Sequence, residues 1–153
     1  MRTIDETDLR ILRAMQTDGN LTVTEIAERV GISQSPCSRR IASLQADGII
    51  KGKRTILDPR KMGFHSVIIV RIKLTGHHAD MLDQFKAAVR DIPEIQVALL
   101  VLGEFDFYLR IIVEDIDHYQ RLMQGKLVAL PGVREMQSSV ILEIIKDSSA
   151  LPL

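Results

Sequence analysis

The stretch Thr22–Leu44, TVTEIAERVGISQSPCSRRIASL, predicts two short helices joined by a tight turn. Thr22 and Glu25 have the spacing of a capping box, which favours a helix start at Thr22. Gly31 follows at a position where a helix favours a left-handed C-terminal residue. Ser33 is expected to cap the second helix, so the stretch predicts a helix, a glycine turn and another helix.

The second of these helices has two chemically different faces. Ile41 and Leu44 fall within about 40° of Cys37 on a helical wheel, which predicts a buried seam with a structural cysteine. The outer face is small, polar and basic, with Ser35, Ser38, Arg39, Ala42 and Ser43. This arrangement is typical of a DNA-reading helix-turn-helix, although a plain helical hairpin with a solvated basic face has the same pattern.

The composition is that of a soluble globular protein, because 46% of the 153 residues are hydrophobic and 26% are charged. No apolar run approaches the roughly 18 residues that span a bilayer, and the first residues contain no signal-peptide core. A single cysteine excludes an intrachain disulfide. We therefore expect a cytoplasmic protein with no membrane partner.

Charge is unevenly distributed along this chain, whose formal net charge is zero. Residues 1–63 contain eleven Lys or Arg against eight Asp or Glu, whereas the remainder contains nine against twelve. Residues 33–61 concentrate seven basic and two acidic residues. Such a basic patch on a neutral molecule indicates a candidate nucleic-acid surface.

Residues 49–57, IIKGKRTIL, predict a small β-hairpin beside the helices, because apolar ends flank a cationic centre. The residues at its tip are candidates for phosphate contacts, with a solvated turn as the alternative: Lys51, Lys53 and Arg54. Together with a first helix capped by Asp5, these elements predict a winged helix-turn-helix domain over residues 1–59.

After a predicted linker at residues 60–65, the domain at residues 66–153 alternates between strand and helix patterns. Strands are predicted at residues 66–74, 95–102, 105–113 and 133–146, and amphipathic helices at residues 81–92 and 116–130. Gly103 and Glu104 fit a two-residue hairpin turn. The order βαββαβ predicts an α+β fold with the ferredoxin-like arrangement.

Two of the predicted strands are apolar on both faces. In residues 95–102, alternate positions on both faces of the predicted strand are apolar. The last predicted strand is also apolar on both faces, with Leu142 on one face and Ile145 on the other. Two helices can cover only one face of a four-stranded sheet, so the other face requires a different cover. We expect a second copy of the same sheet in that place, and hence an obligate dimer.

Several segments resemble the Lrp/AsnC, or feast/famine, family of bacterial and archaeal regulators. Residues 31–41, GISQSPCSRRI, resemble the family's recognition segment, G-[LI]-S-x-[TS]-P-C-x-x-R-[VI]. Residues 102–106, LGEFD, resemble the G-[DE]-[FYW]-D turn of its effector domain. Residues 4–12 resemble the opening helix, and residues 130–133, LPGV, also match, so the resemblance covers nearly the whole chain.

The resemblance implies an amino-acid-responsive transcriptional regulator that binds near-palindromic double-stranded DNA. It implies homodimers that assemble further, often to octamers as tetramers of dimers, with a small amino acid between subunits and no other cofactor. Leucine or another branched-chain or sulfur amino acid is the candidate effector. Leucine-responsive members carry two arginines where this chain has Ala42 and Ser43, so we expect a different preferred operator.

Eight residues are the candidates for DNA contacts. Arg39 is suited to guanine, and the hydroxyl and amide groups near the start of the recognition helix are suited to bases or phosphates. Arg40 lies about 60° from the buried seam, where a phosphate contact and an intramolecular ion pair are both compatible with its position. The set is Gln34, Ser35, Ser38, Arg39, Arg40, Lys51, Lys53 and Arg54.

Eight other residues are the candidates for effector contacts. Gly103 lets a ligand approach the backbone, whose N–H groups suit a carboxylate, while the Glu104 or Asp106 carboxylate suits an ammonium group. The set is Leu102, Gly103, Glu104, Phe105, Asp106 and, by resemblance only, Gln137, Ser138 and Ser139. Without the resemblance, a tight turn with solvated acids is the simpler interpretation of residues 103–106.

Other functional classes have weaker support in the sequence. His77 and His78 are adjacent, and no Cys or carboxylate cluster completes a tetrahedral set, so no metal site is expected. An enzyme is not expected either, although siroheme decarboxylases resemble the family in fold, because the second domain is net acidic. A nucleoid-associated DNA-packaging protein that senses no ligand is the remaining alternative.

Overall fold

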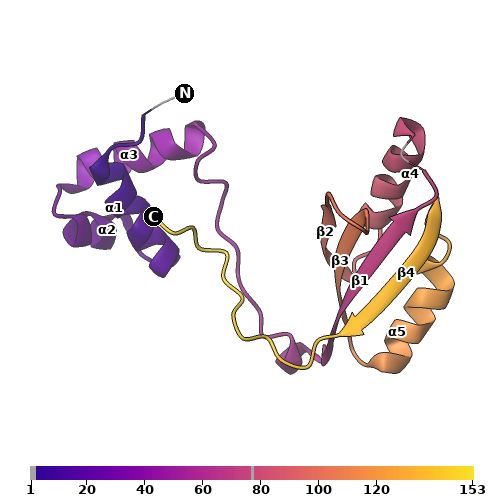
Figure 1. Cartoon of the computed structure of the whole chain (residues 1–153). Coiled ribbons are helices and arrows are strands. Elements are labelled where there is room, and N and C mark those ends of the chain that lie inside the picture. The colour runs from indigo at the N-terminus through magenta and orange to yellow at the C-terminus, as the bar shows by residue number, and fades with distance from the viewer. Residues whose placement is uncertain (1–2, 77) are drawn as a thin grey trace. The chain divides into compact units, whose positions relative to one another are not determined.

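The computed structural model describes residues 3–76 and 78–153, which form two compact units (Figure 1). One unit consists of the residues up to Ile56 together with Lys146–Leu153, and the other consists of Leu57–Ile145. This division differs from the expected domains at two places. Residues 57–65 group with the sheet, and the C-terminal tail, Lys146–Leu153, groups with the N-terminal helices.

The N-terminal unit contains three helices, α1 (Glu6–Thr17), α2 (Val23–Val30) and α3 (Gln34–Ala46). Capping boxes formed by Asp5 with Asp8 and by Thr22 with Glu25 start α1 and α2, as predicted. The side chains between the helices form one apolar core, with Ile11, Leu21, Ile26, Ala27, Val30, Cys37, Ile41 and Leu44 buried. The predicted seam of α3 is therefore confirmed.

The turn between α2 and α3 depends on Gly31, which has a left-handed φ of 74°. Its N–H donates to the carbonyl oxygen of Glu28, and the Ile32 N–H donates to that of Ala27. Ser33 is the N-cap residue of α3, but its side chain makes no capping hydrogen bond, so that part of the prediction is wrong.

The predicted β-hairpin at residues 49–57 is also wrong. Residues 51–58 contain no strand, and all their side chains are exposed. Instead, α3 ends in a turn in which the N–H groups of Ile49 and Ile50 both donate to the Leu44 carbonyl oxygen. The short apolar ends of this segment bury too little surface to hold an isolated two-stranded hairpin.

The second unit is a four-stranded antiparallel sheet with the strand order β2-β3-β1-β4, the predicted ferredoxin-like arrangement. Its elements are η1 (Arg60–Met62), β1 (Ser66–Leu74), α4 (Ala79–Arg90), β2 (Ile95–Leu100), β3 (Phe107–Val113), α5 (Ile116–Leu122), a π-helical turn η2 (Met123–Leu127) and β4 (Val133–Val140). β1 lies in the middle and pairs with both β3 and β4.

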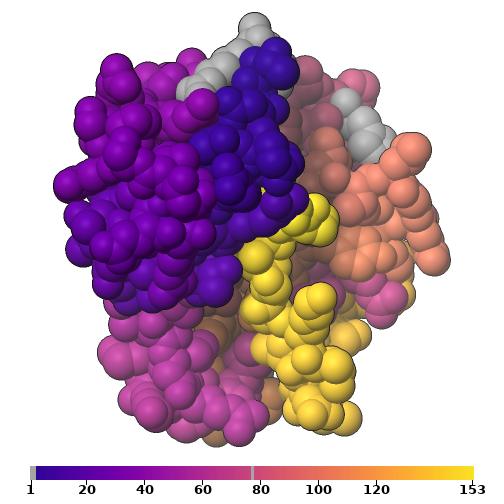
Figure 2. All heavy atoms as spheres, turned by 90° about the vertical axis from the view of Figure 1, so that its left-hand side faces the viewer, coloured from indigo at the N-terminus to yellow at the C-terminus, as the bar shows by residue number. Residues whose placement is uncertain are grey.

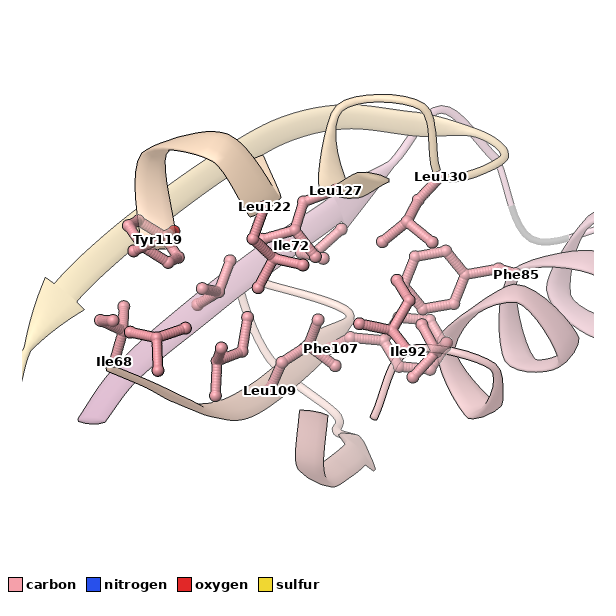
Figure 3. Close-up of a cluster of buried hydrophobic side chains, with 14 of the residues drawn as sticks. Ile68, Ile72, Phe85, Ile92, Phe107, Leu109, Tyr119, Leu122, Leu127 and Leu130 are labelled. Carbon is pink, nitrogen blue, oxygen red and sulfur yellow. The ribbon is translucent and has the colours of Figure 1, made fainter. Parts of the chain in front are cut away.

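Helices α4 and α5 pack against the same face of this sheet (Figure 3). The Phe85 ring of α4 lies with its centroid 4.4 Å from that of Phe107 in β3. Tyr119, Leu122 and the following Leu127 are buried against the same strands. The apolar faces of α4 and α5 are therefore used on one side of the sheet, and no described helix of this unit covers the other side.

We call the uncovered side the open face; it comprises Val67, Ile69, Arg71 and Lys73 of β1 and the residues paired with them. The predicted strand at residues 95–102 contributes less to this face than expected. A β-bulge between Ile95 and Val97 turns Ile95 toward the core, so that only Val97 and Leu99 contribute.

The last strand, β4, is shorter than predicted, because its neighbour β1 begins at Ser66 and offers little backbone to pair with beyond that point. The last registered pair between the two strands is Ile68 with Val140. Leu142 and Ile145 lie beyond the strand and are 92% and 85% exposed, so the expected apolar strand to residue 146 is wrong. Within β4, polar residues occupy the open face, which is therefore mixed: Glu135, Gln137 and Ser139.

The C-terminal tail contacts α1 through one side chain. The Leu151 N–H donates to the Gln16 side-chain oxygen at 2.7 Å, and the Gln16 amide donates to the Leu151 carbonyl at 3.3 Å. Figure 2 shows the yellow tail against the indigo N-terminal residues. Gln16 and Leu151 lie 135 positions apart, so no local sequence pattern could have predicted these two hydrogen bonds.

Gly31→Ala should destabilise the protein by about 1–2 kcal/mol, because an alanine Cβ is disfavoured at φ 74° even though no atom lies within 4 Å of it. Gly19→Ala is the matched control, since its φ is not left-handed and its surroundings are equally empty. Urea unfolding of both variants measures the difference, and equal midpoints would contradict the strain argument.

Candidate DNA-binding and effector sites

The outer face of α3 presents the predicted DNA-reading side chains to solvent. Gln34, Ser35, Ser38 and Arg39 are all exposed, and they share one helix held by a buried seam on the other side. Arg39 makes no hydrogen bond or ion pair with any described residue. These side chains are therefore available to an external partner.

Arg40 occupies a different environment from its neighbour. Its guanidinium forms ion pairs with Asp5 at 2.7 Å and with Asp8 at 2.8 Å. The Asp8 carboxylate raises the pKa of Arg40 by hydrogen bonding, as does that of Asp5. The intramolecular ion pair, one of the two alternatives for Arg40, is therefore confirmed, and it joins α3 to α1. A DNA contact of Arg40 stays a prediction.

The start of α3 is another feature suited to DNA that sequence reasoning did not include. The first turns of α1 and α2 contain acidic residues, but that of α3 contains none. The Ser33 hydroxyl makes no capping hydrogen bond there. Backbone N–H groups at an uncapped helix start suit a phosphate, and the missing acid is the signal that sequence analysis had available.

A cationic segment follows the helices. Lys51, Lys53 and Arg54 are exposed, and none forms an ion pair with a described residue. Although the hairpin is absent, the three charges lie within four residues on an exposed stretch of chain without regular secondary structure. Phosphate contacts need such charges but no regular structure.

The predicted effector loop joins β2 to β3 and is longer than a two-residue turn. The Val101 N–H donates to the Asp106 carbonyl oxygen at 2.9 Å, which closes a loop over residues 102–105. Leu102 and Glu104 are exposed, and the space beside Gly103 is empty. The loop therefore offers apolar, backbone and acidic groups to a ligand.

Two of the predicted effector residues have structural roles in this loop. Phe105 is 4% exposed, so its ring is part of the protein interior. The Asp106 carboxylate accepts the Leu74 N–H at 2.7 Å, and the Asp106 N–H donates to the Ile72 carbonyl at 2.9 Å. Asp106 anchors the loop to β1, and Glu104 remains as the exposed acid.

The three predicted effector residues of β4 do not lie together. Gln137 and Ser139 pair with Arg71 and Ile69 on the open face. Ser138 points to the helical side, where its hydroxyl hydrogen-bonds to that of Tyr119. A prediction from adjacent positions could not separate them, because successive residues of a strand face opposite sides.

The described residues contain no group of three His, Cys, Asp or Glu side chains placed to hold a metal ion. His77, one half of the His–His pair, lies outside the described residues. Within the same residues, no helix is long and apolar enough to cross a bilayer. Burial raises the pKa of the Cys37 thiol, as expected for a structural cysteine.

Comparison with known proteins identifies both halves of the chain. A model of the Lrp/AsnC ligand binding domain matches residues 67–151, and a winged helix-turn-helix DNA-binding model matches residues 4–51. The chain belongs to the Lrp/AsnC family of transcriptional regulators.

Relatives of this Lrp/AsnC regulator match it over nearly its full length. It is 37% identical to the proline dehydrogenase transcriptional activator of Rhodobacter capsulatus, over 96% of each chain. It is 35% identical to the leucine-responsive regulatory protein of Escherichia coli K12, over 98% of this chain and 92% of that one. Since such relatives regulate transcription, the siroheme-decarboxylase alternative is not supported.

A solved structure agrees closely with the fold. The transcriptional regulator of Neisseria meningitidis, in complex with L-methionine, is 33% identical and superimposes with a TM-score of 0.94. The match covers 98% of this chain and 97% of that one. The AsnC-family regulator of Agrobacterium tumefaciens gives a TM-score of 0.92 at 32% identity.

Arg40→Ala should lower the free energy of unfolding, because the fully buried Asp8 carboxylate would lose its 2.8 Å ion pair with Arg40. Arg39→Ala is the matched control and should change stability by less than about 0.5 kcal/mol. Equal urea midpoints for the two variants would contradict the assignment of Arg40 to the helix contact.

The same contact should be sensitive to acid. A hydrogen bond from the Asp8 backbone N–H and one from Arg40 lower the pKa of Asp5 below its ordinary value of 3.8. The stabilisation from these two hydrogen bonds is therefore fully present above pH 3.8, the ordinary pKa of an aspartate. It is lost as the pH falls through the lower pKa that Asp5 has in the folded protein. The difference between the midpoints of wild type and Arg40→Ala should shrink over that range.

Proposed function

We propose that this regulator reads DNA with Gln34, Ser35, Ser38 and Arg39 and responds to a small amino acid. The observation that carries the DNA-reading assignment is the contrast between two adjacent arginines. Arg40 is held by Asp5 and Asp8, whereas Arg39 is exposed and makes no intramolecular ion pair with a described residue. An unpaired arginine on the outer face of a recognition helix suits guanine in the major groove.

The cationic segment supplies the second part of the DNA contact in this proposal. Lys51, Lys53 and Arg54 contact phosphates on either side of the groove and position the helix without reading bases. Each phosphate contact releases counterions, so binding weakens steeply with salt. Regulation of this kind takes place in the cytoplasm, on the nucleoid.

The proposed assembly is a homodimer that forms through the open face, with tetramers of dimers as the further assembly. Apolar side chains support this pairing, because Val97 and Leu99 are 38% and 53% exposed in a single chain. A dimer presents two recognition helices about one turn of DNA apart, which suits a near-palindromic site.

The proposed effector is an amino acid bound at the loop over residues 102–105. The Neisseria relative is an L-methionine complex, which makes methionine the first candidate, with leucine and other branched-chain amino acids next. Leu102 suits an apolar side chain and Glu104 an ammonium group. The effector acts by binding one assembly or spacing of the DNA-binding heads more tightly than another.

Arg39→Ala should cost about 1–3 kcal/mol of specific affinity, measured by fluorescence anisotropy on a duplex selected from a random library. Lys53→Ala should weaken binding to all duplexes alike and reduce the salt slope by about 1. Arg29→Ala, an exposed arginine in the last turn of α2, is the control. Unchanged affinity of the Arg39 variant would remove that residue from the interface.

A thermal-shift screen against the twenty amino acids tests the effector proposal. A true effector should stabilise the protein by about 2.7 kcal/mol when present at a hundred times its dissociation constant. If none of the twenty raises the melting temperature while DNA binding is intact, the ligand-independent packaging protein becomes the better description.

A further inference from the structure

Arg71 is a partly buried arginine that has no carboxylate partner. It lies in the middle of β1 on the open face, and it makes no hydrogen bond or ion pair with any described residue. Its guanidinium carbon lies over the Phe105 ring, 5.3 Å from the ring centroid. A guanidinium has five N–H donors and stays charged at any ordinary pH, so these donors lack acceptors.

The contact with Phe105 holds the Arg71 guanidinium near the loop without using its N–H donors. Stacking of arginine on an aromatic ring occupies the flat face of the guanidinium and leaves the N–H groups at its edge free. The ring itself is held firmly, because Phe105 is buried and the next residue, Asp106, is bonded to β1. A fixed fork of this kind matches the two oxygens of a carboxylate.

The neighbours of Arg71 on the open face suit the rest of a small amphipathic ligand. Antiparallel pairing places Tyr108 on one side of Arg71 and Gln137 on the other. Leu99 follows in the same row, next to Tyr108, and is 53% exposed. The row therefore contains a cation, two polar side chains and an apolar one.

The effector residues proposed above contain no cation. Asp106 is engaged with β1, so Glu104 is the exposed charge of the loop, and it suits only the ammonium group of an amino acid. The carboxylate of a zwitterion needs a donor of the opposite charge, and Arg71 is the arginine in contact with this loop through Phe105.

We propose that Arg71, held over Phe105 beside Gln137, binds the carboxylate of the amino-acid effector. This assignment rests on the proposed effector function and adds the anion-binding residue of that site. A carboxylate from a second copy of the chain, packed on the open face, is the alternative partner of Arg71. The experiment below distinguishes this partner from the effector carboxylate.

Isothermal titration of the full-length protein with L-methionine and with L-methioninamide, which lacks the carboxylate charge, tests this assignment. Wild type should bind L-methionine about 10- to 100-fold more tightly than the amide. In Arg71→Gln this preference should fall below about threefold. Arg71→Lys keeps the charge without the fork and should give an intermediate preference.

Lys73→Gln is the matched control, because Lys73 is two residues along the same strand and face and its substitution removes the same charge. It should keep the wild-type preference. Circular dichroism melts and DNA anisotropy establish that each variant is folded, and light scattering measures its oligomeric mass.

The outcomes separate the two proposals. If wild type binds L-methionine and Arg71→Gln keeps the full preference, the assignment of Arg71 is overturned and the effector proposal stands. If Arg71→Gln reduces only the oligomeric mass, the carboxylate comes from a second copy and the assignment is again overturned. If wild type binds none of the twenty amino acids, both proposals fail together.

Discussion

A partly buried ion pair sets the position of the recognition helix in this regulator. Among the described residues, Asp8 is the one charged residue that is buried. Burying a carboxylate costs several kcal/mol of folding free energy unless the carboxylate is paired with a cation. The pair forms only where α3 brings Arg40 within 2.8 Å of Asp8. That register turns the preceding Arg39 outward, where its side chain is exposed and forms no ion pair with a described residue.

In the second unit, the helices cover only one face of the sheet, and this sets the composition of the open face. Both helices use their apolar faces on one side, where they bury Phe85, Tyr119 and Leu122 against the strands. The open face then contains apolar and charged side chains in the same rows, including Arg71, which lies over the Phe105 ring. A surface of this composition suits association or ligand binding better than contact with water alone.

Local patterns in the sequence were sufficient for much of this architecture. Capping boxes at Thr22 and Asp5, the seam through Cys37 and the order of strands and helices were predicted from residues within a few positions of each other. The prediction of a wing was wrong because an isolated two-stranded hairpin is only marginally stable in water. The described side chains of residues 51–58 are all exposed, so the segment does not pack on a surface that would stabilise strands. The π-helical turn after α5 had no sequence signal that we could identify.

The sequence by itself determined the helix-turn-helix, the ferredoxin-like order and the outer face of α3, because caps, glycine turns and periodicity act over a few residues. Tertiary structure alone decided the roles that depend on distant partners. It pairs Arg40 with Asp5 and Asp8, engages Asp106 with β1, separates Ser138 from Gln137, and places Arg71 over Phe105. Charge and hydrogen-bonding groups act over a few ångströms, and only the folded chain fixes which of them come that close.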